Sequence, residues 1–463
     1  MERVVCTVHV SWTNQSHQHH WGVQQYFRCQ QPRPFLRKRL SCSVCVGLSK
    51  QGERFLSSVA TSTTNENVNR LIRKFVGSSP KPVALDALSH LLSPHTTHPH
   101  LSSIAFPLYS EISEAPWFDW NPKLVAQLVA LLEKQGRYDE SATLLSESIS
   151  KLQSKERDLL QFYCNLIESH SKHNAFHGFD DSFSRLNQLV SDSNSFYVKK
   201  QGYKAMISGL CEMGSPREAE DLIGEMRGKG LKASLFEFRC VLYGYGKLGL
   251  FQDMHKTLQE MESQGLEVDT VCSNMILSSY GAHNAHSHMI HWLQKMKTSG
   301  IPFSLRTYNS VLNSCPTIMS IISGIDSHHG YPISFRDLME VLNEDEALLI
   351  KELVESSVLS EAIKWSNSEA KLDLHGMHLA SAYVVMLQWM EELRNRSIEG
   401  KQVFPTEITV VCGSGKHSSI RGESPIKCMV KELVTRRRSP LRIDRKNTGC
   451  FVAKGKAIIE WLQ

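Results

Sequence analysis

Residues 200–230 have the sequence KQGYKAMISGLCEMGSPREAEDLIGEMRGKG, and this stretch decides the fold. Apolar residues recur at helical spacing from Tyr203 to Cys211. Gly214 interrupts the pattern, and a second helical stretch is predicted from Arg217 to Met226, before Gly230. The stretch therefore predicts two antiparallel helices joined by a short turn.

The same layout returns downstream. It fills residues 235–269 and 270–304 and continues in part over 305–339, and Gly230, Gly265 and Gly300 are 35 residues apart. Weaker blocks begin at Asn121, so we expect about six units over residues 122–340. One helix pair cannot bury its apolar face alone, so neighbouring pairs must stack. The predicted fold class is an α-helical repeat superhelix followed by a small α/β domain.

The central blocks resemble the pentatricopeptide repeat family. The resemblance lies in Tyr203–Cys211, in Glu218-Ala219, in Glu225-Met226 before Gly230-Leu231-Lys232, and in Thr307-Tyr308-Asn309. Members of that family bind single-stranded RNA in plastids and mitochondria, one base per repeat. A helix-pair array suits this role because each repeat offers side chains at the spacing of one nucleotide. The resemblance implies an RNA-binding protein.

In that family the fifth and last residues of each repeat select the base. Carried onto this sequence, these RNA-base-binding positions are Lys204 with Ser234, Arg239 with Asp269, Asn274 with Ser304, and Asn309 without a clear partner. Asn274 with Ser304 is a standard combination, which implies a pyrimidine. The other positions do not name a base.

The charges are segregated along the chain. Residues 1–54 carry 8 Lys/Arg and 2 Asp/Glu (net +6), residues 55–371 carry 29 and 36 (net −7), and residues 372–463 carry 15 and 9 (net +6). A basic C-terminal region favours an anionic partner. The acidic middle favours an alternative, a repeat scaffold that binds organellar gene-expression proteins, because phosphate binding usually leaves a basic stripe.

Composition excludes two classes of protein. No apolar run approaches the roughly 20 residues that cross a bilayer, which excludes a membrane protein. Twelve scattered cysteines with one CxxC pair are not a disulfide framework.

Between Glu2 and Glu53 there is no acidic residue, so residues 1–54 are predicted to be a transit peptide to the chloroplast, with the mitochondrion as the alternative. Residues 55–121 are rich in Ser, Pro and His and are expected to be an irregular linker.

The composition changes after an expected helical linker over residues 341–371. Alternation in Leu372–His375 predicts a strand, an amphipathic helix follows from Leu379 to Leu393, and Ile408–Val411 predicts a second strand. Ser424-Pro425 opens another helix, and Asn447-Thr448-Gly449 is predicted to turn a final hairpin. Residues 372–463 thus predict a compact α/β domain.

Four segments of this region, in order, resemble the small MutS-related (Smr) domain. They are Leu372-Asp-Leu-His-Gly376, Gly413-Ser-Gly-Lys-His-Ser418, Gly422-Glu-Ser-Pro-Ile-Lys427 and Asn447-Thr-Gly-Cys-Phe-Val452. The resemblance covers the last 92 residues and implies a βαβαββ sandwich like the C-terminal domain of translation initiation factor three. It also implies nicking or endonuclease activity. Repeats followed by this domain resemble plant organellar pentatricopeptide-Smr proteins, with a role in RNA processing.

The candidate catalytic residues are Asp373, His375 and His417. If RNA is cleaved, His375 and His417 are expected to be the acid/base pair, because imidazole exchanges protons near neutral pH. Asp373 is expected to orient His375 or to hold a divalent cation such as Mg²⁺. The glycine loop supplies the phosphate-binding residues Gly413, Gly415 and Lys416. The alternative function is an RNA-binding protector that does not cleave, with the loop binding phosphate only.

Overall fold

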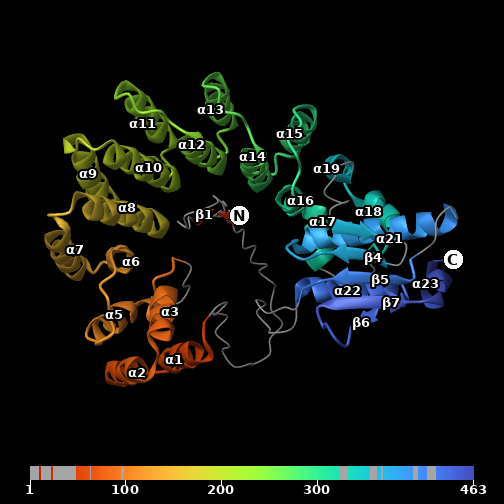
Figure 1. The fold of residues 1–463 in the computed structure, drawn as a ribbon, viewed down its shortest axis with the longest axis horizontal. Coiled ribbons are helices and arrows are strands. Elements are labelled where there is room, and N and C mark those ends of the chain that lie inside the picture. The colour runs from red at the N-terminus through yellow and green to blue at the C-terminus, as the bar shows by residue number, and fades with distance from the viewer. Residues whose placement is uncertain are drawn as a thin grey trace. The chain divides into compact units, whose positions relative to one another are not determined.

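The chain divides into two compact units. The N-terminal unit comprises residues 34–266, and the C-terminal unit comprises residues 267–463 grouped with residues 1–33 (Figure 1). The computed structural model describes residues 10–11, 22–23, 48–62, 64–94, 99–323, 332–354, 362–366, 369–399, 405–413 and 424–462. None of the helices within these ranges combines the length and the apolar character needed to span a bilayer.

The N-terminal unit is entirely helical over its described residues. Its helices are α1 (Lys50–Ala60), α2 (Asn65–Ser78), α3 (Lys81–Leu91), α4 (Pro99–Ser102), α5 (Ala105–Ser113), α6 (Pro122–Lys134), α7 (Tyr138–Leu152), α8 (Glu156–His173), α9 (Phe176–Asp192), α10 (Phe196–Met213), α11 (Pro216–Gly228), α12 (Leu235–Lys247) and α13 (Phe251–Ser263). From α6 onward the helices form antiparallel pairs, and α6, α8, α10 and α12 pack on one another in sequence. The predicted helical repeat fold is confirmed.

The expectation of an irregular linker over residues 55–121 is wrong. Helices α1 to α5 occupy most of it and have their own core, in which the rings of Phe55 and Phe75 stack 4.0 Å apart. The error came from proline, because Pro82 lies in the first turn of α3 and Pro99 begins α4. Proline in the first turn of a helix loses no hydrogen bond and supports the helix start. Residues 1–47 lie outside the described ranges except for the antiparallel pair β1 (Val10–Ser11) and β2 (Gly22–Val23).

Two glycines 35 residues apart allow the repeats to stack closely. A Cβ built on Gly209 of α10 would lie 2.5 Å from Cγ2 of Ile167 in α8 and 2.8 Å from Cε2 of Phe179 in α9. At the equivalent position of the next repeat, a Cβ on Gly244 would lie 2.9 Å from the Cβ of Pro216. Each first helix therefore approaches the preceding pair more closely than any side chain would permit.

The C-terminal unit continues the helix pairs and adds a sheet. Its elements are α14 (Thr270–Ala282), α15 (His286–Thr298), α16 (Leu305–Leu312), α17 (Pro316–Ser323), α18 (Phe335–Val341), α19 (Glu344–Val354), β3 (Ile363–Trp365), β4 (Glu369–Asp373), α21 (Leu379–Glu399), β5 (Glu407–Val411), α22 (Pro425–Arg436), β6 (Arg442–Ile443), β7 (Cys450–Lys454) and α23 (Lys456–Leu462). We call residues 362–462 the C-terminal module. In the described part of the expected helical linker over 341–371, α19 is helical, whereas β3 and the start of β4 form a hairpin.

The sheet has the strand order β3-β4-β5-β7-β6 (Figure 1). Strands β4 and β5 are parallel and the other pairs are antiparallel, with Asp373 opposite Val411 and Val411 opposite Cys450. Ala370 and Leu372 of β4, like Ile408 and Val410 of β5, are fully buried. The predicted hairpin is confirmed, and Asn447 accepts the N–H of Gly449 at its turn.

Helix α21 is the centre of the C-terminal unit. It packs against α16, α17 and α18 as well as against α22 and α23. Residues 380–390 are buried without interruption, and Trp389 and Tyr383 have no exposed surface. A helix that is apolar on all sides must be covered on all sides. The last repeat and the C-terminal module therefore share one core.

We predict that Gly209→Ala lowers the free energy of unfolding of the full chain by about 1–3 kcal/mol, because the added methyl group overpacks the contact with α8 and α9. Gly224→Ala is the matched control. Gly224 lies in α11 of the same repeat, and a Cβ there meets no atom within 4 Å. It should stabilise the chain by about 0.5–1 kcal/mol, as expected for Gly→Ala in an open helix position. Urea unfolding measures both values. Equal effects of the two substitutions would contradict the close stacking.

Candidate nucleic-acid interface

The last residues of the repeats are helix caps. Ser234, Asp269 and Ser304 are the N-caps of α12, α14 and α16. The Ser234 hydroxyl accepts the N–H of Phe236, the Asp269 carboxylate accepts that of Cys272, and the Ser304 hydroxyl accepts that of Thr307. Each side chain thus satisfies a helix-terminal donor that would otherwise lack a partner. These positions lie at the start of each first helix.

The fifth positions of the N-terminal unit carry cations. The Lys204 ammonium lies over the Phe236 ring, 4.6 Å from its centroid, so it is near the turn that Ser234 caps. Arg239 is buried within α12. Such positions supply positive charge to an otherwise acidic repeat region, but a cation does not distinguish bases by itself.

The structure brings Asn274 and Ser304 together. Nδ2 of Asn274 donates to the Ser304 hydroxyl at 3.0 Å, and the Thr307 hydroxyl donates to Oδ1 of Asn274 at 2.7 Å. Asn274 is only 4% exposed, and these two bonds fix the orientation of its amide. One N–H and one lone pair of the amide remain beyond these two bonds.

Asn309 has a different environment. Its Oδ1 accepts the N–H of His378 at 2.8 Å, and its Nδ2 donates to the carbonyl of Gly376 at 3.3 Å. One turn later, Nδ2 of Asn313 donates to Nδ1 of His378. These two amides, one in α16 and one at its C-cap, therefore hold a segment of the C-terminal module.

The two chemistry-bearing loops of the module start at the same edge of the sheet. Asp373 ends β4 and lies in register with Val411 at the end of β5, directly before Cys412 and Gly413. The N–H of His375 donates to Oδ1 of Asp373 at 2.9 Å, and the N–H of Leu374 donates to the Val411 carbonyl. Asp373 thus shapes the turn through the backbone, and the His375 side chain is exposed. Asp373 was expected to orient the His375 side chain, but its observed hydrogen bond is with the backbone N–H of His375.

The remaining loop residues Gly415, Lys416 and His417 lie outside the described residues. Cys412 is described, and burial raises the pKa of its thiol to about 12, which leaves it protonated and unsuited to act as a nucleophile. Within the described ranges, no group of three His, Cys, Asp or Glu residues could hold a metal. Asp373 and Asp444 are described carboxylates at this edge, since the N–H of Asp444 donates to the carbonyl of Cys450, which lies opposite Val411.

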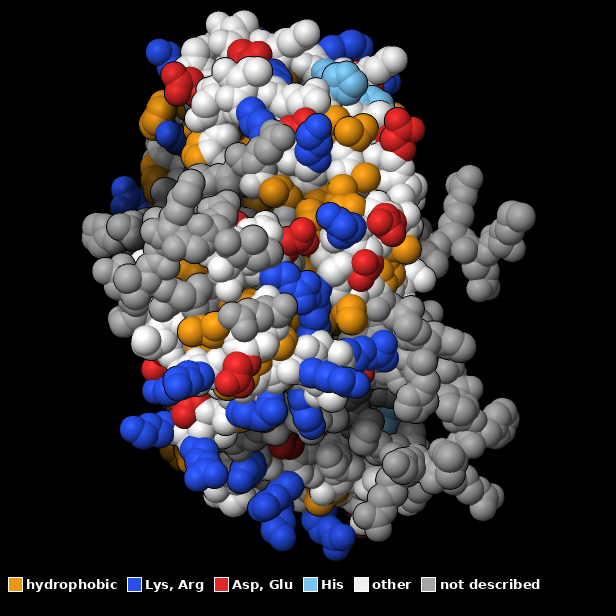
Figure 2. Space-filling view, turned by 90° about the vertical axis from the view of Figure 1, so that its right-hand side faces the viewer, with side chains coloured by type: hydrophobic (Ala, Val, Ile, Leu, Met, Phe, Trp, Pro, Cys, Tyr) orange, Lys and Arg blue, Asp and Glu red, His pale blue; other side chains and the backbone are white. Residues whose placement is uncertain are grey.

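Lys and Arg side chains are numerous on the face drawn in Figure 2. Figure 2 shows Lys and Arg side chains spread over the lower part of the face in view, with few Asp or Glu among them. Some cations of the module have structural partners, because Arg436 pairs with Glu432 at 2.8 Å and Arg437 donates to the Ile333 carbonyl at 2.6 Å. Arg438, the third residue of this run, is exposed. A nucleic-acid strand would therefore meet a surface of scattered cations.

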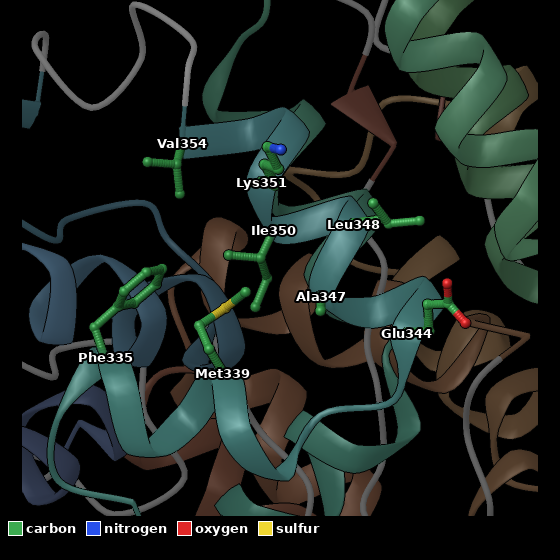
Figure 3. Close-up of a pocket in the computed structure, with 8 residues that line it drawn as sticks. All are labelled: Phe335, Met339, Glu344, Ala347, Leu348, Ile350, Lys351 and Val354. Carbon is green, nitrogen blue, oxygen red and sulfur yellow. The ribbon is translucent and has the colours of Figure 1, made fainter.

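An apolar groove lies between α18 and α19, and none of the cations named above lines it (Figure 3). Phe335, Met339 and Ile350 lie toward one another within it, and Glu344 and Lys351 are its charged lining residues. None of the predicted site residues lines the groove, and it brings together no set of polar groups that could bind a nucleotide.

The sequence did not identify three residues that form hydrogen bonds with Asn274, Asn309 or each other, namely Thr307, Asn313 and His378. A signal for Asn313 was present, because Asn309 and Asn313 are four residues apart and so share one face of the expected helix. Two amides on a buried helix face need polar partners. The identity of those partners, 65 to 69 residues further along, could not be read from spacing.

Comparison with known proteins places these repeats in a family. The PPR repeat family matches residues 203–231 and 238–266, and the Pentatricopeptide repeat domain family matches residues 256–317. The crystal structure of PPR10 from maize and that of PPR10 in complex with an 18-nt psaJ RNA element share 13% and 14% identity with this chain. They give TM-scores of 0.26 and 0.25 over 65% of this chain, which spans about half of each.

Among curated proteins, Pentatricopeptide repeat-containing protein At2g17033 of Arabidopsis thaliana is 57% identical over 420 residues, which are 90% of this chain and 83% of that protein. The Arabidopsis thaliana proteins At1g18900 and At1g74750, also named as pentatricopeptide repeat-containing, are 29% and 28% identical over 91 residues, one tenth of each. Given the extent of the first of these similarities, the chain belongs to the pentatricopeptide repeat protein family.

Proposed function

We propose that this chain binds single-stranded RNA in the chloroplast and takes part in RNA processing there. In this proposal the repeats recognise bases and the C-terminal module contacts the phosphodiester backbone. The observation that carries the proposal is the pair Asn274 and Ser304, which lie 30 residues apart and meet at 3.0 Å in a family of RNA-binding repeats.

The Asn274 amide is prepared for one base. Ser304 and Thr307 use one donor and one acceptor site of the amide. Their hydroxyls lie 3.2 Å apart on the same edge of the amide, so the remaining N–H and lone pair point to opposite sides of it. A base that offers an acceptor or a donor can bond to one of these sites, as RNA-binding repeats do at unstacked bases. Because the amide is already fixed, little side-chain entropy is lost on binding.

We propose that the C-terminal module is an Smr-type domain. From β4 to β7 its elements follow one another as β4-α21-β5-α22-β6-β7, a βαβαββ order, with β3 before and α23 after them. Residues 372–463 carry a net charge of +6 (15 − 9). The exposed His375 beside Asp373 suits contact with a phosphate, and with His417 it would supply an acid/base pair for endonucleolytic cleavage. A module that binds the backbone without cleaving it would make the protein a protector.

We predict that Asn274→Asp changes the base preference at a single RNA position. Loss of the amide N–H donors leaves an acceptor-only group, so discrimination at that position should change by about 1–3 kcal/mol, the range for one good base contact. Selection from a pool of random 20-nucleotide RNAs, followed by sequencing of bound molecules, measures the preference. Wild-type protein that retains no base preference would refute the RNA-recognition proposal and favour a protein scaffold.

We predict that the full chain cuts transcripts from isolated chloroplasts at defined sites and that Asp373→Ala and His375→Ala abolish the cuts. Glu460→Ala is the control, because Glu460 is an exposed carboxylate of α23, which follows the end of β7 that pairs with Glu407 rather than the end that pairs with Val411. It removes the same charge away from the Asp373 edge and should leave cleavage intact. Protection without cuts by wild-type protein would show that the module binds but does not cleave.

A further inference from the structure

Asn309 occupies the same repeat position as Asn274, 35 residues later, in the next first helix. Helices α14 and α16 pack side by side, so the two asparagines belong to consecutive places in one row. The partners of Asn274 come from the adjacent repeat, whereas those of Asn309 come from the C-terminal module. Beside Asn309, residues 376–378 of the module therefore occupy the place that Ser304 and Thr307 of the adjacent repeat occupy beside Asn274.

The contact is specific in its hydrogen bonding. An amide nitrogen can only donate, so the bond from Asn313 requires that Nδ1 of His378 be an acceptor and that the imidazole be neutral with its proton on Nε2. Burial, with a smaller contribution from the nearby Arg306, lowers the pKa of His378 and stabilises that neutral form. The Asn309 amide uses both its oxygen and its nitrogen on the same segment.

Gly376 is required for this approach. Its φ of +81° is in the left-handed region, and a Cβ there would lie 3.2 Å from Cδ2 of Leu305 in the first turn of α16. The preceding residue is His375, whose side chain is exposed at the sheet edge. The segment that the two asparagines hold is therefore continuous with the loop that carries His375.

We infer that Asn309 and Asn313 are positioning residues that hold the His375 loop at the end of the base-recognition row. Base recognition then ends at Asn274, and a single-stranded RNA leaving that position passes next along the Asp373–His375 edge. This inference rests on the proposed function, since it names where the bound strand goes. It assigns to Asn309 a role in joining the two parts, in place of the base recognition expected from its position.

The first test compares Asn309→Ala with Asn274→Ala in the full chain, using the random 20-nucleotide RNA pool. Asn274→Ala should lose the preference at one RNA position. Asn309→Ala should leave the preference unchanged at every position, because its amide is bound to the module. Loss of a base preference in Asn309→Ala would overturn the inference.

The second test follows the path of the strand. The pool is synthesised with 4-thiouridine and crosslinked by light, and the tryptic peptide of residues 372–394 is quantified by mass spectrometry. Per molecule of bound RNA, its crosslink should fall at least about fivefold in Asn309→Ala and stay unchanged in Asn274→Ala. A purely stabilising role of Asn309 would leave the crosslink per bound RNA unchanged and would contradict the inference.

A third measurement needs no RNA. The His378 amide donates to Asn309, so its hydrogen exchange should accelerate about tenfold in Asn309→Ala and remain slow in Asn274→Ala. If Asn309→Ala does not fold, Asn313→Ala removes the second bond and should weaken the same crosslink. Wild-type protein without base preference but with slow His378 exchange would refute the proposed function while leaving the docking intact. Fast exchange in wild-type protein would refute the docking itself.

Discussion

The last helix pair of a repeat array has an apolar face that no further pair covers. In this chain α21 covers it. The helix packs against α16, α17 and α18, is buried over residues 380–390, and belongs to the α/β module that follows. The burial of apolar surface at this junction contributes roughly 25 cal/mol for each Å² removed from water, and it is the constraint on which the C-terminal unit depends. A freely tethered module would leave both surfaces exposed.

Hydrogen bonds add orientation to this burial. Apolar packing alone allows several rotations of one element on another, whereas the bonds from Asn309 and Asn313 to residues 376–378 fix a single arrangement. Buried polar groups often provide such specificity at a modest gain in stability. For an RNA-binding array, a fixed junction sets a constant number of nucleotides between the last recognised base and the sheet edge. That constancy is what site-selective contact with the backbone requires.

The repeats could be predicted because two local features of the sequence show their period: the helical spacing of apolar residues and the glycines every 35 residues. That the loops after Asp373 and Val411 begin at one edge of the sheet could be expected too, since β4 and β5 are parallel. Three features could not. Prolines that begin helices were taken as loop signals in residues 55–121, β3 is too short to show alternation, and the partners of Asn309 lie 67 and 69 residues away. Long-range polar contacts leave no local pattern.

The most direct test of this account is native-state hydrogen exchange of the full chain at increasing denaturant, followed in peptides from α16 (Leu305–Leu312) and α21 (Leu379–Glu399). If the last repeat and the module share one core, both peptides should exchange through a common opening, with the same free energy and the same denaturant dependence. Opening of α21 at a distinctly lower free energy than α16 would show that the module folds and unfolds independently, and would contradict the account.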